Sequence, residues 1–149
     1  MSSFDPATFL NQTVEGSNDT SVTPVPVGEY PAIAEKVDVK TWQSRDGSSS
    51  GLKLEIVWDI QDDAVKQLTG RETVRCRQQQ MLDLTETGAL DMGKGKNVGL
   101  GRIREALEMN DPSQPFSFGA IQGRMAKVKV SHRIYEDNIF DEIKAVTKM

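Results

Sequence analysis

Basic residues recur at every second position in two separate stretches of the chain. One residue separates Arg75 from Arg77, and one residue separates Lys127 from Lys129. Side chains at positions i and i+2 of a β-strand point to the same face of its sheet, so each pair would project from one side. Lys and Arg side chains bind phosphate groups and release their counterions. The first chemistry that the sequence suggests is therefore the binding of a polyanion.

Further residues extend this candidate surface. Lys53 alternates with apolar residues, while Trp42 and Tyr135 lie at or near loops, where their rings could stack on nucleic-acid bases. Basic residues in glycine-rich loops could contact backbone phosphates. The predicted nucleic-acid-binding residues are Lys36, Lys40, Trp42, Arg45, Lys53, Arg75, Arg77, Lys94, Lys96, Lys127, Lys129 and Tyr135. The alternative interpretation is that Lys and Arg on the outside of strands only solvate a sheet.

A glycine-rich loop partly matches a nucleotide-binding motif. Gly88, Gly93 and Lys94 have the spacing of a Walker A loop, but Gly95 stands where Ser or Thr would hold magnesium. No buried parallel strand leads into the loop, so nucleotide hydrolysis is not expected. Two interpretations of residues 93–96 remain. The segment could contact backbone phosphates, or it could be a mobile loop without a ligand.

Residues that commonly carry catalysis are sparse. His132 is the only histidine, so there is no histidine pair for a metal and no obvious base for a nucleophile. Cys76 is the only cysteine, which excludes an internal disulfide and a multi-cysteine zinc site and predicts a buried, reduced thiol. The adjacent carboxylates at 62–63 and 136–137 are common caps of turns. We therefore predict no enzyme, no metal and no cofactor.

The charge of the chain is unevenly distributed. A formal net charge of −4 argues against a polyanionic partner. Residues 1–28, however, contain Asp5, Glu15 and Asp19 and no basic residue, so the remainder of the chain is nearly neutral. A neutral domain can still bind a polyanion if its basic residues share one face, and the strand pattern must decide whether they do.

The stretch 52–60 is the clearest structural element that could position these residues. Large apolar side chains occupy its even positions and mostly charged ones its odd positions, a pattern typical of a half-buried strand. Trp58 shares the parity of the apolar set, so we expect it in the core. The expected outward set is Lys53, Glu55, Val57 and Asp59.

Four more segments have the length and alternation of strands. They cover residues 28–42, 71–84, 123–133 and 139–148, and the first changes phase near Ala34 and Glu35, as expected for a bulge. The polar loop 44–51 would join the first strand to 52–60 as a hairpin.

Capping residues predict three short helices. Asp5 and Pro6 can begin the first, Asp62 and Gly70 can bound the second, and Asn97 can cap the third. Residues 11–26 have the composition of an extended linker. The predicted organisation is an acidic arm over residues 1–26, with a short helix and small apolar patch that includes Phe4, and one barrel domain over 27–149.

Three strands, a helix and two strands, in that order, is the layout of the OB-fold. The segments 29–33, 51–56, 98–107 and 123–132 are, moreover, similar to those of bacteriophage single-stranded-DNA-binding proteins of the OB-fold type. This resemblance covers residues 27–148. It implies a mainly β, five-stranded, OB-fold-like Greek-key barrel with one helix between strands three and four. The chain ends in 144–149 without the acidic docking tail of bacterial single-strand binders, so recruitment of partners through a tail is not expected.

The function that follows is non-catalytic binding of single-stranded DNA in phage DNA replication or recombination, in the host cytoplasm. The alternative is a phage virion structural or assembly protein, in which the barrel is a packing unit and the arm, residues 4–26, reaches a neighbouring subunit. Expected partners are single-stranded DNA and, as a further option, a second copy of the chain or other phage proteins. No apolar run is long enough to span a bilayer and the N-terminus lacks a secretory signal, so no membrane partner is expected.

Overall fold

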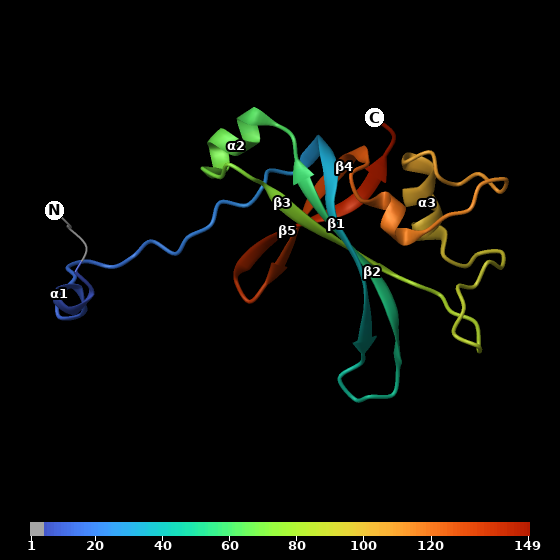
Figure 1. Ribbon diagram of the computed structural model, residues 1–149, viewed down its shortest axis with the longest axis horizontal. Helices are drawn as coiled ribbons and strands as arrows, with labels where there is room; N and C mark the ends of the chain where they lie inside the picture. Colours follow the sequence, from blue (N-terminus) through green and yellow to red (C-terminus); the bar gives the residue numbers. More distant parts are fainter. Residues whose placement is uncertain (1–4) are drawn as a thin grey trace.

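The computed structural model describes residues 5–149, so the predicted arm residue Phe4 lies outside the described range. The described chain is mainly β, with five strands in one antiparallel sheet of order β3-β2-β1-β4-β5. The strands are β1 (Gly28–Gln43), β2 (Ser50–Ile60), β3 (Arg75–Met81), β4 (Met125–Tyr135) and β5 (Asn138–Thr147). The long strand β1 is central and pairs with both β2 and β4, as Figure 1 shows.

The strands β3 and β5 are the two edges of this sheet. Within the described residues β3 pairs only with β2 and β5 only with β4, so the hydrogen-bonded sheet is not closed. The two edges nevertheless approach each other, because the Cys76 thiol of β3 lies 3.6 Å from Asp141 Oδ1 of β5. The five predicted strands are confirmed as one antiparallel sheet with facing edges.

A bulge in β1 changes which residues face the core. The register with β2 shifts between Ala34 and Lys36, which confirms the predicted position. Before the shift Ala34 faces the core opposite Trp58, whereas after it Lys36 lies opposite Val57 on the outer face. The bulge therefore points the even-numbered Lys36 and Lys40 outward, although the even-numbered Ala32 and Ala34 before it face the core.

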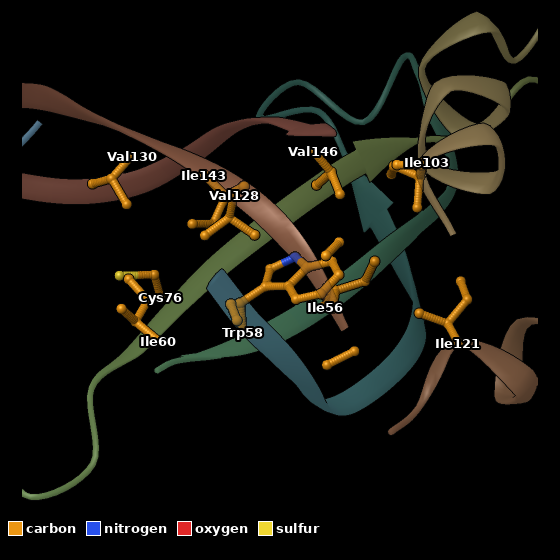
Figure 2. Packing of buried hydrophobic residues seen from close by; sticks show 14 of the residues in the cluster. Ile56, Trp58, Ile60, Cys76, Ile103, Ile121, Val128, Val130, Ile143 and Val146 are labelled. Atoms are coloured by element: carbon orange, nitrogen blue, oxygen red, sulfur yellow. The ribbon is translucent and has the colours of Figure 1, made fainter. Parts of the chain in front are cut away.

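The core lies against the inner face of the sheet. Trp58 is fully buried, as predicted, and its indole Nε1 donates a 2.9 Å hydrogen bond to Gln78 Oε1 on β3. Figure 2 shows Trp58 among apolar side chains from the other strands and α3. The neighbouring core residues include Ile56, Ile60, Cys76, Ile103, Val128, Val130, Ile143 and Val146.

The described chain also contains four short helices, the first of which lies away from the sheet near the start of the chain. They are α1 (Pro6–Leu10), α2 (Asp63–Thr69), α3 (Val98–Ala106) and the 3₁₀ helix η1 (Phe118–Ile121). The caps predicted for α1 and α2 are confirmed, since Asp5 caps α1 and α2 runs from the cap Asp62 to Gly70, whose φ is 69°. The predicted apolar face of α3 is buried, which fixes this helix on the core.

The packed part of the chain begins before the predicted boundary between residues 26 and 27. Val25 is fully buried in the core, and its backbone N–H donates a 2.9 Å hydrogen bond to Asp141 Oδ2. Arg71 donates a 2.8 Å hydrogen bond to the carbonyl oxygen of Thr23. These residues therefore belong to the folded domain, and the free arm is shorter than predicted.

Candidate nucleic-acid interface

The outer face of β1, β2 and β3 collects half of the predicted binding residues. The strand register places Lys40 directly opposite Lys53, and it places Val57 opposite both Lys36 and Arg77. Residues directly opposite on antiparallel strands share one face of the sheet. We call this set the basic face, and its members are Lys36, Lys40, Trp42, Lys53, Arg75 and Arg77.

Two cations of the basic face are held by glutamates. Arg75 donates hydrogen bonds of 2.6 and 3.0 Å to the two carboxylate oxygens of Glu35, and Lys40 Nζ lies 3.1 Å from Glu55 Oε1. The hydrogen bond from Arg75 lowers the pKa of the Glu35 carboxyl from its ordinary value, and the hydrogen bond from Lys40 does the same for Glu55. These two cations are thus partly neutralised within the chain.

Two other cations of the basic face are available to a ligand. A third cation, Lys36, lies 3.8 Å from Asp38. Among residues 5–149, Lys53 and Arg77 make no ion pair and no side-chain hydrogen bond. They project from neighbouring strands, with Arg77 opposite Val57 and Lys53 four residues earlier on the same strand as Val57. This spacing offers two positive charges along one side of β2 and β3.

The Trp42 indole packs against Gly51 on the opposite strand. Trp42 pairs with Gly51, where an added Cβ would lie 2.9 Å from the indole Nε1. The indole N–H is buried and, within the described chain, has no hydrogen-bond partner. Gly51 thus makes room for an aromatic ring on the basic face, and an aromatic ring is a platform on which a base can stack.

A groove of about 850 Å³ continues the basic face toward β5. Its first wall is formed by the outer residues of β3 and its second wall by β5, with one residue contributed by β4. The side chains that define it include Arg75, Arg77, Gln79 and Met81 on β3, Arg133 on β4, and Phe140 and Lys144 on β5. The sequence prediction named only Arg75 and Arg77 among them and missed the other five, which include the basic Arg133 and Lys144 and the aromatic Phe140.

The β5 wall of the groove combines the Phe140 ring with one basic residue, Lys144, and two carboxylates, Asp141 and Glu142, while Arg133 reaches it from β4. The guanidinium of Arg133 lies 5.5 Å from the centre of the Phe140 ring and its Nε lies 3.6 Å from Glu142. A signal for this wall was present in the sequence, since Phe140, Glu142 and Lys144 alternate with the buried Ile143.

Lys127 and Lys129 lie on a different part of the sheet. Both point outward from β4, where Lys127 is opposite Pro31 and Lys129 is opposite Glu29 of β1. The sheet order separates β4 from β3 by β1 and β2 on one side and by β5 on the other. The structure therefore does not bring these lysines beside the β3 arginines, and the single predicted surface is divided into two.

The remaining predicted residues lie in loops or at strand ends. Arg45 lies in the β1–β2 turn, Lys94 and Lys96 lie between β3 and α3, and Tyr135 ends β4. All four are exposed. Tyr135 shares a face of the β4–β5 hairpin with Arg133 but is not among the residues that line the groove.

No protein-family model matches the chain, and no curated protein is significantly similar to it. No helix among residues 5–149 is long and apolar enough to cross a membrane.

The glycine-rich loop before α3 is organised by internal hydrogen bonds. The buried Asn97 side chain donates 2.9 Å hydrogen bonds to the carbonyl oxygens of Asp83 and Asp91. Asn97 occupies the predicted N-cap position of α3, but its φ is 51° and its side chain makes no capping hydrogen bond. The Gly93 N–H donates to Asp91 Oδ1 at 2.9 Å, so this amide is already engaged and does not face a phosphate.

Groups that carry catalysis in other proteins have structural contacts here. Burial raises the pKa of the Cys76 thiol to about 12, and the cysteine is free and buried as predicted. His132 Nε2 lies 2.6 Å from the carbonyl oxygen of Val25, which it helps to hold on the core. Across residues 5–149, no group of three or more His, Cys, Asp or Glu side chains is placed to hold a metal ion.

Proposed function

We propose that this chain binds single-stranded DNA without catalysing a reaction, in phage DNA replication or recombination in the host cytoplasm. The observation that carries the proposal is the basic face, where Lys53 and Arg77 lie near Glu55 without forming an ion pair with it and share a face with the ring of Trp42. Proteins that bind single strands combine a cationic track for the backbone with aromatic rings for the bases. The groove adds a second ring, Phe140, on the far side of β3.

The strand arrangement supports an OB-fold-like Greek-key barrel. The strand β1 is shared by β2 and β4, the free edges of β3 and β5 flank one groove, and α3 lies between β3 and β4 in the sequence. In OB-folds, oligonucleotides bind across strands two and three and the loops that join strands one to two and four to five. Those positions carry the basic face, Arg45 in the first loop and Tyr135 beside the second.

The aromatic residues favour a single strand over a duplex. A ring such as Trp42 can stack only on a base whose face is free, whereas the bases of a duplex are stacked on one another. A duplex could engage the cations of the basic face through its phosphates but would gain nothing from the rings. We therefore expect duplex DNA to bind more weakly than a single strand of equal length.

A second candidate function is a structural or assembly protein of the virion. The arm favours it, because Phe9 and Leu10 are exposed on α1 and the arm carries carboxylates but no basic residue. In that role the sheet domain is a packing unit and the arm contacts a neighbouring subunit. Abundance in purified virions separates the two candidates, since a replication protein should be nearly absent from them.

A fluorescence-anisotropy titration with a labelled oligothymidine and a matched duplex tests the proposed function. We expect preferential binding to the single strand, with the logarithm of affinity falling linearly as the logarithm of salt concentration rises. Each neutralised phosphate contributes roughly 0.7 to that slope, so Lys53 and Arg77 together should supply about 1.4. A folded protein that shows no salt-dependent binding to a long single strand at low ionic strength would overturn the proposal.

Tryptophan fluorescence provides an internal check on the same sample. The chain has two tryptophans, of which Trp58 is fully buried. Quenching by bound DNA should therefore come from Trp42 and should disappear in Trp42→Leu. Quenching that persists in this variant would place the DNA away from the basic face.

A further inference from the structure

The helix α1 is well formed but buries none of its residues. The Asp5 carboxylate accepts hydrogen bonds from Ala7 N at 3.1 Å and from Thr8 Oγ1 at 2.8 Å, which caps the helix. Phe9 is nevertheless 70% exposed and Leu10 83% exposed. Figure 1 shows α1 at the end of an extended segment, away from the sheet. So short a helix is not stable alone in water, and two large apolar side chains on it indicate an apolar partner surface.

An apolar surface of the matching kind lies on the β4–β5 hairpin. Ile134 and Ile139 are directly opposite each other and are 74% and 51% exposed. They continue the inward-facing row of Val130 and Ile143 beyond the point where the core ends. Beside them is a hollow of about 1010 Å³, which is lined by Ile139 and by Val22 of the arm.

We propose that α1 of one copy of this chain docks beside the Ile134–Ile139 pair of a second copy, so that two copies exchange arms. An exchange about a two-fold axis forms the same contact twice, which doubles the apolar surface that is buried. This inference concerns self-association and does not depend on DNA binding.

The course of the arm favours a second copy over the same chain. Residues 17–22 already form one wall of the hollow, and the hydrogen bonds of Thr23 and Val25 fix the arm where it meets the sheet. From there the arm runs outward and carries α1 away from its own hairpin (Figure 1). Residues 11–22 can span up to about 40 Å when extended, which is enough to reach the hairpin of an adjacent domain.

Charge makes a smaller contribution to the contact. The arm contains Glu15 and Asp19 but no Lys or Arg, and the exposed guanidinium of Arg133 adjoins Ile134. Asp137 at the hairpin turn opposes the approach of an acidic arm. The apolar side chains of α1 and the hairpin therefore carry the proposal, and association should depend only weakly on salt.

Sedimentation equilibrium of the full-length protein at rising concentration tests the inference. The wild-type chain should form a dimer, and Phe9→Ser/Leu10→Ser should raise the dimer dissociation constant by at least about tenfold, because two apolar contacts are lost on each side. Ile134→Ser/Ile139→Ser should have the same effect. The control is Leu68→Ser, which removes a similarly exposed apolar residue from α2 and should leave the dimer unchanged.

A mixture of the two double variants shows whether the contact forms between chains. The arm variant keeps an intact hairpin and the hairpin variant keeps an intact arm, so the mixture should form a heterodimer with one exchanged contact. It should be weaker than the wild-type dimer and tighter than either variant alone. Thermal unfolding midpoints equal to that of the wild type would show that all chains are folded.

Two results would overturn the inference. One is a wild-type chain that remains a monomer up to about 1 mM, a concentration that would reveal even weak association. The other is a dimer that neither double variant weakens, which would place the interface elsewhere. A monomer in which Phe9 contacts Ile139 of its own chain would give the first result.

Discussion

The outer faces of β3 and β4 have the same sequence pattern and different surroundings. Arg75 and Arg77 on β3, and Lys127 and Lys129 on β4, each alternate with buried residues and point outward. The strand β3 is an edge of the sheet and borders an open groove, whereas β4 is paired on both sides by β1 and β5. Residue spacing thus determines which face a side chain occupies, while strand order determines what lies beside it.

Their neighbours give the two faces different chemistry. Arg77 shares its face with Lys53 and with the ring of Trp42, so charge and a stacking surface occur together. On β4, Lys129 is opposite Glu29 and Lys127 is opposite a proline, with no aromatic residue at either position. We therefore propose that nucleic acid binds the face of β3 and that the lysines on the face of β4 only solvate the sheet.

The largest expected effect comes from removing the support beneath the β2–β3 face. Trp58→Ala should lower the free energy of unfolding by about 3–5 kcal/mol, because it deletes a buried ring and leaves Gln78 without its partner. Urea denaturation measures this. Lys53→Ala, on the opposite side of the same strand, is the control and should change stability by less than about 0.5 kcal/mol. An unchanged urea midpoint in Trp58→Ala would contradict the burial of this ring.

The next largest effect is expected at the stacking ring. Trp42→Leu should weaken single-strand binding by about 1–3 kcal/mol, with little change in the salt slope, because stacking releases few counterions. Gly51→Ala is a matched variant, since the new methyl group would lie 2.9 Å from the indole and displace it. Equal loss in Tyr135→Leu would show that the hairpin also stacks on bases. If Trp42→Leu and Gly51→Ala both kept the wild-type affinity for single-stranded DNA, the Trp42 ring would not contribute to binding.

A smaller effect, of opposite sign, is expected at Glu35. Glu35→Gln should release Arg75 from its ion pair and tighten single-strand binding, with the salt slope steeper by roughly 0.7. Since the ion pair lowers the pKa of Glu35, its stabilising contribution is present above the ordinary glutamate pKa and is lost as pH falls through the lowered value. At a pH below the lowered pKa of Glu35, the affinity of the wild-type protein for single-stranded DNA should therefore approach that of Glu35→Gln. Weaker binding by Glu35→Gln would mean that Arg75 must be held in place to act.

Features that depend on local spacing could be predicted from the sequence. The alternation in residues 52–60 predicted both the strand and the burial of Trp58, because the two-residue period of a strand is a local property. The bulge at residues 34–36 was predictable for the same reason, as a local change of phase. Local capping by Asp62 also gave the start of α2 correctly.

Features that depend on distant pairing could not be predicted in this way. Val25 is buried in the core, and its N–H donates to Asp141, more than a hundred residues away. The groove wall at Phe140 exists because β5 faces β3 across the open sheet. Asn97 has the sequence signature of a helix cap, but hydrogen bonds to Asp83 outcompete that role. No periodicity within a single segment contains this information.

Two charge-matched double variants test the distinction between the two faces most directly. Lys53→Gln/Arg77→Gln and Lys127→Gln/Lys129→Gln each remove two positive charges, so any effect of net charge alone is the same in both. The measurement is the slope of log affinity against log salt for a long single-stranded oligonucleotide. We predict that the first variant loses roughly 1.4 from the slope while the second keeps the wild-type value. Equal flattening in both variants, or flattening in the second alone, would contradict the assignment of DNA binding to the face of β3.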